Sequence, residues 1–188
     1  MILWIILAVV ILIVIWLWLT YNGLIKARLR ADEALSDITV QEKRRLDLIP
    51  NLVSTVKGYA KHEKSTLENV TKARAAVMKA PAKDLAGRAK AENFLSETLK
   101  SLFAVTENYP DLKANENFLQ LQSELTDTED KIQASRRFYN GNIRAFNMKL
   151  QVFPTNIIGN MLGFKSREFY DVDESEKETI KKAPDVKF

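Results

Sequence analysis

The stretch from Phe118 to Phe146, FLQLQSELTDTEDKIQASRRFYNGNIRAF, has the clearest periodicity in the chain. Bulky side chains recur every seven residues in one column, and mostly small or polar side chains recur beside them. Small residues let a facing helix approach closely while bulky ones fill the space next to it. We therefore predict a long, coiled-coil-like helix over residues 113–150, although a binding track along the second column is an alternative. The two columns are Phe118, Leu125, Ile132, Tyr139 and Phe146, and Leu121, Thr128, Ser135 and Asn142.

Upstream of this helix, apolar residues recur at alternating steps of three and four, which is typical of helices with one buried face. A helix is expected over residues 84–107, between a break at Pro81 and a turn at Pro110. Another stripe runs over residues 24–59. Beyond it, either this helix continues to about residue 80, or the capping-box spacing of residues 65–68 begins a new one. The pattern predicts an all-α protein with three to four long helices.

Charged residues interrupt the first stripe close to a proline. Glu42 and Arg45 fall on its apolar face, while Pro50 lacks an amide hydrogen and kinks or ends a helix. In one interpretation the helical phase shifts at the proline and the charges are solvated. In the other, a buried polar layer fixes the register of neighbouring helices. The candidate members of that layer are Glu42, Arg45, Asp47 and Asn51.

Residues 1–19, MILWIILAVVILIVIWLWL, form an uncharged apolar run. At 1.5 Å per residue they span roughly 28 Å, about the thickness of a hydrocarbon core. No basic residue precedes the run, so we do not expect a cleaved signal peptide. Trp4, Trp16 and Trp18 lie near its ends, where indole rings favour the membrane interface. The sequence predicts a single transmembrane anchor over residues 1–20.

Basic residues follow the predicted span closely. Lys26, Arg28 and Arg30 lie just beyond it, and no charged side chain precedes it, so the positive-inside rule predicts an outside N-terminus and a cytoplasmic bundle. Residues 20–80 carry 12 Lys and Arg against 7 Asp and Glu. Such an excess is attracted to anionic membrane lipid. Since no nucleic-acid recognition motif or aromatic stacking platform accompanies it, we expect no nucleic-acid partner.

The segment FPTNIIGNMLGFKSREFY, residues 153–170, predicts a short helix that ends at Gly163. Its apolar side chains need cover, so we expect it to dock on the bundle or on the membrane surface, or to form an oligomer contact. The charged residues 171–188 contain few apolar side chains, which predicts a disordered tail. The candidate docking residues are Phe153, Pro154, Asn156, Ile157, Leu162 and Phe164.

Residues capable of catalysis or metal binding are scarce. His62 is the only histidine, and no second histidine completes a helical zinc motif. The chain has no cysteine, and its six glycines form no phosphate-binding loop. Carboxylate pairs such as Glu92 with Glu97, or Glu129 with Asp130, are interpreted as solvated. We therefore expect no metal site, no cofactor and no enzymatic activity.

Four blocks of sequence resemble the LemA family of bacterial membrane-anchored helical proteins. They lie within residues 20–170 in the family's order. The resemblance implies an antiparallel bundle, here residues 21–170, behind one membrane span. Thr39 and Glu42 depart from the family pattern, which has Asp and Leu there, and the second departure argues against burial of Glu42. The blocks are YNGLIKARLRADEALSDITVQEKRRLDLIPNLVSTVKGYAKHE, AVTENYPDLKANENFLQLQSEL, TEDKIQASRRFYNGNIRAFN and FPTNIIGNMLGF.

Two functional hypotheses follow, since the family has no established biochemical activity to transfer. The first is a membrane-anchored scaffold that binds a protein partner or a second copy of itself at the cytoplasmic face. The span lacks a small-xxx-small motif, so oligomerisation would depend on the soluble helices. The alternative is an extracytoplasmic bundle that senses or binds a ligand, which requires the opposite topology.

Overall fold

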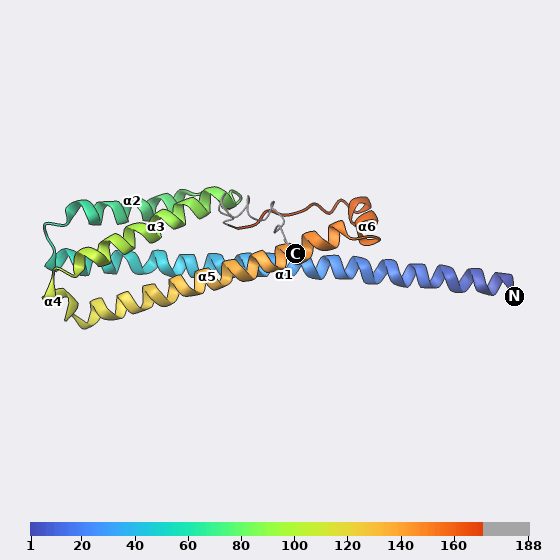
Figure 1. Cartoon of the computed structure of the whole chain (residues 1–188), viewed down its shortest axis with the longest axis horizontal. Helices are drawn as coiled ribbons and strands as arrows, with labels where there is room; N and C mark the ends of the chain where they lie inside the picture. Colours follow the sequence, from blue (N-terminus) through green and yellow to red (C-terminus); the bar gives the residue numbers. More distant parts are fainter. Residues whose placement is uncertain (171–188) are drawn as a thin grey trace, which may run out of the picture. The chain divides into compact units, whose positions relative to one another are not determined.

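Six α-helices make up the part of the chain that the computed structural model describes, residues 1–170 (Figure 1). No strand occurs among these residues, and the all-α prediction is confirmed. The predicted disordered tail, residues 171–188, lies outside the described residues. The helices are α1 (Ile2–Tyr59), α2 (Lys64–Lys79), α3 (Leu85–Thr106), α4 (Pro110–Lys113), α5 (Glu116–Gln151) and α6 (Thr155–Met161).

The chain divides into two compact units, and both α1 and α5 contribute to each. Unit 1 contains residues 1–38 and 135–168. Unit 2 contains residues 39–134 together with the described residues 169–170.

Unit 2 is an antiparallel bundle of four helical segments. Figure 1 shows the chain reversing direction from α1 to α2, from α2 to α3, and again through α4 into α5. Each of these segments turns apolar side chains into one core, and full burial of a Leu, Ile, Val or Phe side chain contributes about 1.5–3 kcal/mol. Core residues include Ile49, Leu52 and Val56 of α1, Val70 and Val77 of α2, Leu95 and Leu102 of α3, and Phe118 and Leu125 of α5.

The helix boundaries in unit 2 settle an alternative left open by the sequence. The chain leaves α1 after Tyr59 and begins α2 at Lys64, so the first helix does not continue to residue 80. α3 starts after Asp84, whose Oδ1 accepts a 2.9 Å hydrogen bond from the backbone N–H of Gly87. A Cβ atom at Gly87 would lie 2.2 Å from Asp84 Oδ2, so a side chain at this position would force the capping carboxylate to shift.

The helix α1 continues through Pro50, which is exposed. Proline cannot donate a hydrogen bond to the carbonyl four residues earlier. That carbonyl, on Leu46, instead accepts a 2.9 Å hydrogen bond from Nε of Arg74 on α2. The interpretation in which the proline ends the helix is therefore wrong, and a neighbouring helix satisfies the group that the proline leaves free.

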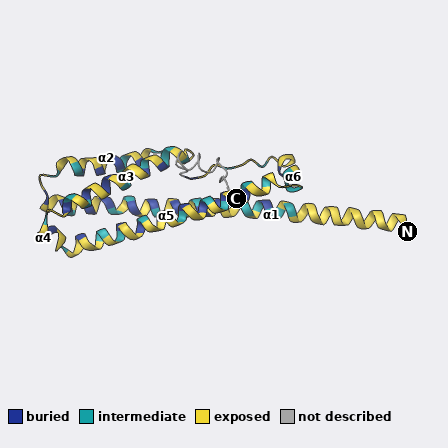
Figure 2. Ribbon diagram, viewed as in Figure 1, coloured by how far each residue is buried: buried dark blue, intermediate teal, exposed yellow. Residues whose placement is uncertain are grey.

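The predicted columns of α5 are largely internal. All five bulky residues are buried, with Phe118 and Leu125 in unit 2 and Tyr139 and Phe146 in unit 1. In the second column Thr128 is buried, whereas the other members are half-buried. Figure 2 shows the buried positions along one side of this helix. The packing prediction made from the seven-residue period is thus confirmed for the bulky column.

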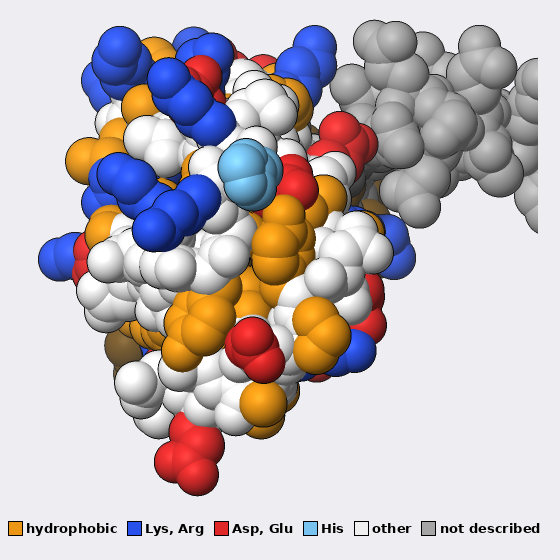
Figure 3. All heavy atoms as spheres, turned by 90° about the vertical axis from the view of Figure 1, so that its left-hand side faces the viewer, with side chains coloured by type: hydrophobic (Ala, Val, Ile, Leu, Met, Phe, Trp, Pro, Cys, Tyr) orange, Lys and Arg blue, Asp and Glu red, His pale blue; other side chains and the backbone are white. Residues whose placement is uncertain are grey.

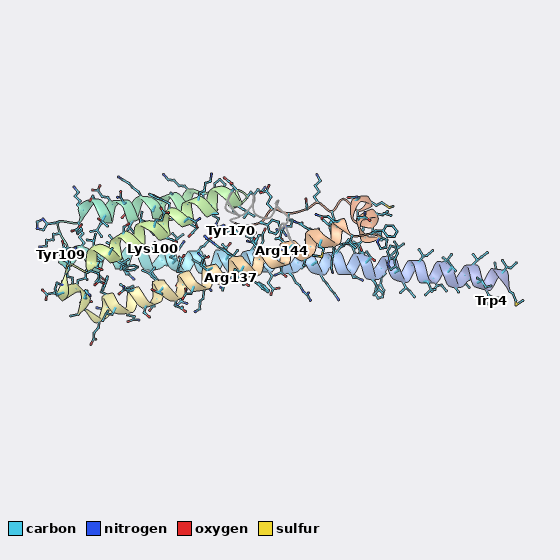
Figure 4. All side chains as sticks on the ribbon, in the orientation of Figure 1. Trp4, Lys100, Tyr109, Arg137, Arg144 and Tyr170 are labelled. Carbon is cyan, nitrogen blue, oxygen red and sulfur yellow. The ribbon has the colours of Figure 1, made fainter. Side chains whose placement is uncertain are left out.

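Residues 2–19 of α1 are apolar and exposed (Figure 2). Among the described residues, α1 is the one helix long and apolar enough to cross a membrane, with a mean hydropathy of 3.2 over an 18-residue window of which 0% is buried. Trp4 projects outward from the helix near the N-terminus and is exposed (Figure 4). Trp16 and Trp18 are also exposed. These properties fit a membrane anchor.

In unit 1, residues 162–168 run beside α5. The side-chain amide of Asn147 on α5 forms two hydrogen bonds with the backbone of Arg167. Its oxygen accepts from the Arg167 N–H at 2.9 Å, and its nitrogen donates to the Arg167 carbonyl at 2.8 Å. Earlier in α5, the hydroxyl of Tyr139 donates a 3.1 Å hydrogen bond to the carbonyl of Glu168. Gly163 has φ 72°, a left-handed conformation that glycine adopts at no steric cost and that ends α6 where predicted.

Candidate functional site

A layer of buried charge lies inside unit 2. Glu42 and Arg45, one turn apart on α1, are each 1% exposed. On α3, Arg88, Glu92 and Ser96 are spaced four positions apart, so their side chains lie on one helix face. We call this group the charge layer: Glu42, Arg45, Arg88, Glu92, Ser96, Glu129 and Tyr170.

Arg45 is the centre of one half of the charge layer. Its guanidinium forms salt bridges with the carboxylates of Glu92 on α3 and Glu129 on α5. Its Nη1 also donates a 2.9 Å hydrogen bond to Ser96 Oγ, and that hydroxyl donates to Glu129 at 3.2 Å. The planar guanidinium suits such a site because several fixed N–H donors can engage separate acceptors. One side chain therefore joins three helices of the bundle.

Glu42 is the centre of the other half. Its Oε2 lies 2.5 Å from Arg88 Nη2, and its Oε1 accepts a 2.6 Å hydrogen bond from the Tyr170 hydroxyl. Tyr170 is 1% exposed although it follows a long stretch of irregular chain. Glu42 therefore connects α1 both to α3 and to the end of the described chain.

The charge layer contains two cations, Arg45 and Arg88, and three carboxylates, those of Glu42, Glu92 and Glu129. Removing an ion from water costs several kcal/mol unless partners compensate it, and removal of one partner is strongly destabilising. We therefore expect this layer to select which helix faces meet, and in what register, rather than to add much net stability. Its charged groups are held in ion pairs that join one helix to another, which favours a structural role.

The structure separates the residues predicted for a polar layer. Glu42 and Arg45 belong to it, so the interpretation in which both are solvated is wrong, and the departure from the family pattern at Glu42 did not prevent burial. Asp47 and Asn51 are exposed, so their assignment to the layer is corrected. They lie two and six residues after Arg45, outside the three-four spacing that continues the buried stripe to Ile49 and Leu52.

Sequence analysis missed most partners in the charge layer. Glu92 and Glu129 were interpreted as solvated, but Glu92 is 0% exposed and Glu129 pairs with Arg45. Tyr170 was expected only as part of the apolar docking segment, and Arg88 and Ser96 were assigned no role. A signal was present, since Arg88 and Glu92 carry charges opposite to those of Glu42 and Arg45 with helical spacing on both stretches. Using it required knowing that α1 and α3 face each other.

Tyr109, Tyr139 and Asp127 have shifted pKa values. The Tyr109 hydroxyl donates a 2.9 Å hydrogen bond to Glu63, and this bond, with burial and the negative charge of Glu63, raises the pKa of Tyr109. Burial raises the pKa of Tyr139 in unit 1. A hydrogen bond from Lys131 lowers the pKa of Asp127. None of these groups lies in the charge layer.

A lysine-rich groove lies between the end of α1 and α2. Its cavity volume is about 440 Å³. Figure 3 views this end of unit 2, where Lys and Arg side chains gather on one side. Glu68 is the only acidic side chain lining the groove and lies 3.9 Å from Lys64. We call the four cationic residues the groove lysines: Lys57, Lys61, Lys64 and Lys72.

The membrane-proximal basic residues and the candidate docking residues lie in unit 1. Lys26 and Arg30 are exposed. The Arg28 guanidinium lies 5.7 Å from the ring centroid of Phe164, a cation–π contact. Of the docking candidates, Phe153, Ile157 and Leu162 are exposed, whereas Pro154, Asn156 and Phe164 are half-buried. Within residues 1–170, no group of three or more His, Asp or Glu side chains could hold a metal ion.

Comparisons with known proteins match this chain to the LemA family and to shorter stretches of magnetosome proteins. The family model of the LemA family matches residues 34–188. Protein LemA of Metamycoplasma hominis is 28% identical over 156 residues, which cover 83% of this chain and 71% of that protein. Magnetosome protein MamQ 2 of Paramagnetospirillum magneticum is 28% identical over 80 residues, which cover 43% of this chain and 29% of that protein. Magnetosome protein MamQ of Magnetospirillum gryphiswaldense is 25% identical over a stretch of the same length.

Proposed function

The chain belongs to the LemA family, and from this premise we propose that it is a membrane-anchored scaffold. Its bundle binds a protein partner, or a second copy of the chain, at the cytoplasmic face. The observation that carries the proposal is the continuity of α1. The exposed apolar run at its start and the core residues Ile49, Leu52 and Val56 belong to one uninterrupted helix.

Along α1, helical structure is unbroken between the apolar run and the residues of the bundle core. The charge layer then fixes which faces of α1, α3 and α5 meet. Such a device suits a protein that presents a defined surface at a membrane.

The groove lysines are the surface that best fits a protein partner of defined charge. They line a hollow whose apolar lining consists of the half-buried Val53 and the buried Leu67. A partner with an acidic, partly apolar segment complements both the charge and the apolar lining. The occupant we favour is therefore an acidic segment of another protein, and a second copy of the chain is the competing outcome.

Topology is the first test of this proposal. Because the chain has no cysteine, Ile2→Cys and Ser101→Cys each give one thiol, and both native side chains are exposed. Intact cells are treated with a membrane-impermeant maleimide. The proposal predicts labelling of the Ile2→Cys variant without permeabilisation and of the Ser101→Cys variant only after it. The reverse result rejects the cytoplasmic scaffold and favours an extracytoplasmic sensor or ligand-binding bundle.

Partner binding is tested at the groove lysines. A photo-crosslinker at Thr71, beside the groove, is activated in native membranes with the full chain. The double variant Lys57→Glu/Lys61→Glu is expected to lose the cross-link, and added oligoglutamate to compete for it. Lys100→Glu, an exposed site on α3, reverses charge elsewhere and serves as control (Figure 4). Equal cross-linking in all three proteins would reject the groove as the contact, and a product of twice the chain mass would identify a second copy.

A further inference from the structure

Unit 1 leaves a concentrated apolar surface uncovered around α6. Five large apolar side chains between residues 152 and 162 are at least half exposed. In unit 2, exposed side chains of this kind are scattered over different helices, as with Val40, Met78 and Leu119. We call the uncovered group the α6 patch: Val152 54%, Phe153 74%, Ile157 51%, Met161 82% and Leu162 51%.

The short helix α6 is apolar on two faces, and the unit covers only one of them. Ile158 and Gly159 are buried. A Cβ atom at Gly159 would lie 2.8 Å from Leu150 Cδ2, so the absent side chain lets α6 approach α5 closely. Ile157 and Met161, four residues apart, lie together on the remaining face. A helix with this composition needs a second apolar neighbour.

The position of the α6 patch identifies that neighbour. Lys149, at the end of α5, donates a 3.4 Å hydrogen bond to the carbonyl of Gly23 on α1. Gly23 lies four residues beyond Leu19, the end of the apolar run, which is about 6 Å along a helix. The Phe164 ring also contacts Arg28. Within unit 1, the patch is therefore close to the level at which α1 would leave the hydrocarbon core.

Charge in unit 1 also favours a lipid surface. No Asp, Glu, Lys or Arg occurs from Leu150 to Phe164, and Lys149 and Lys165 flank that stretch. Beyond the apolar run, unit 1 carries 9 Lys and Arg against 4 Asp and Glu. Uncharged apolar segments flanked by cations are typical of helices that lie in the plane of a membrane containing anionic lipid.

We propose that the α6 patch inserts into the interface of the membrane that α1 crosses and forms a second, peripheral membrane contact. This inference rests on the proposed membrane anchor. Since α6 packs on α5, the contact would hold the far end of α5 against the bilayer in addition to the start of α1. The occupant is thus a lipid surface rather than a partner protein.

The experiment measures depth in lipid with single thiols in the full chain. Met161→Cys, Met78→Cys and Leu12→Cys are labelled with an environment-sensitive nitrobenzoxadiazole dye and reconstituted into vesicles of phosphatidylethanolamine and phosphatidylglycerol. Met78 is an exposed methionine of unit 2 and is the matched control for Met161. Leu12 lies within the apolar run and reports on the anchor itself. Spin-labelled lipids then quench any dye within the bilayer.

Blue-shifted emission and quenching are expected at positions 12 and 161 but not at position 78. Quenching at position 12 without quenching at 161 overturns the inference and leaves the anchor intact. A blue shift at position 161 that grows with protein density, without quenching by lipid, also overturns it and identifies a second copy as the occupant. Quenching at neither position 12 nor 161 overturns the anchor and the inference together.

Discussion

The hydroxyl of Tyr170 donates a 2.6 Å hydrogen bond to Oε1 of Glu42, and both side chains are 1% exposed. The two residues are 128 positions apart in the sequence. This bond fastens the last described residue to the first helix, at the charge layer. It makes Tyr170 part of the bundle of unit 2.

Removal of this hydroxyl by Tyr170→Phe is expected to lower the free energy of unfolding by about 1.5–3 kcal/mol, the range for hydrogen bonds to charged groups. Arg88 would still pair with Glu42, so the bundle should fold. The measurement is denaturant unfolding of the full chain in detergent micelles, followed by circular dichroism. Tyr21→Phe, at an exposed site, is the control, and equal losses for both variants would contradict a specific bond.

Arg45 and Arg44 are adjacent residues with contrasting environments. Arg45→Met would leave the Glu92 carboxylate buried without its cation, and such a change costs about 3–5 kcal/mol. Arg44 is exposed and its nearest carboxylate atom, on Asp127, lies 3.7 Å away, so Arg44→Met should cost less than about 1 kcal/mol. Thermal unfolding of both variants measures the difference. Similar melting temperatures would show that the buried pair has no such role.

The complete charge cluster around Arg45 should behave differently from its single members. Replacing Arg45 by Met together with Glu92→Leu and Glu129→Leu removes the charges and their desolvation at once. Buried ion pairs exchanged for apolar residues of similar volume are often neutral or stabilising. We expect the triple variant to melt at or above the wild-type temperature but to form a less uniform oligomer or register, measured by chemical cross-linking. A triple variant less stable than Arg45→Met alone would contradict this account.

Tyr139 predicts a loss of stability at alkaline pH. Burial raises its pKa above the ordinary value of about 10, so the folded state favours the neutral hydroxyl. The stabilisation that this preference gives the folded protein is fully present below the unfolded-state pKa of Tyr139. It is lost as the pH rises through the higher folded-state pKa. Tyr139→Phe should remove this component, while losing about 1 kcal/mol at neutral pH with the bond to Glu168. Unfolding measured from neutral to strongly alkaline pH tests it, and an unchanged alkaline slope in the variant would refute it.

Local periodicity was sufficient to predict most helices. The expected spans 84–107 and 113–150 correspond to α3 and α5, and the heptad column of α5 is buried as predicted. Both features depend on side chains three, four or seven residues apart on one helix. The exposed apolar start of α1 was likewise evident from composition alone.

The charge layer could not be derived in the same way. Its members come from α1, α3, α5 and the C-terminal segment, and the stripe of α1 keeps its phase through Glu42 and Arg45 only because partners on other helices compensate the burial. Pairings of this kind depend on which faces meet, and the sequence pattern does not define that. The effect of Pro50 on α1 could not be derived from the sequence pattern either, because it depends on a hydrogen-bond donor from α2.

That donor gives a final prediction, since Arg74 Nε bonds the Leu46 carbonyl that Pro50 leaves without an amide. Arg74→Met should cost about 1–3 kcal/mol in the native background, because a half-buried carbonyl loses its donor. In a Pro50→Ala background the alanine N–H can bond the same carbonyl, so Arg74→Met should cost less. A double-mutant cycle by denaturant unfolding measures the coupling, expected within about 0.5–3 kcal/mol. Lys72 is an exposed cation nearby, so Lys72→Met should show no coupling to Pro50. If Arg74→Met lowers the free energy of unfolding equally in both backgrounds, the Arg74 side chain stabilises α1 by packing and not through the Leu46 carbonyl.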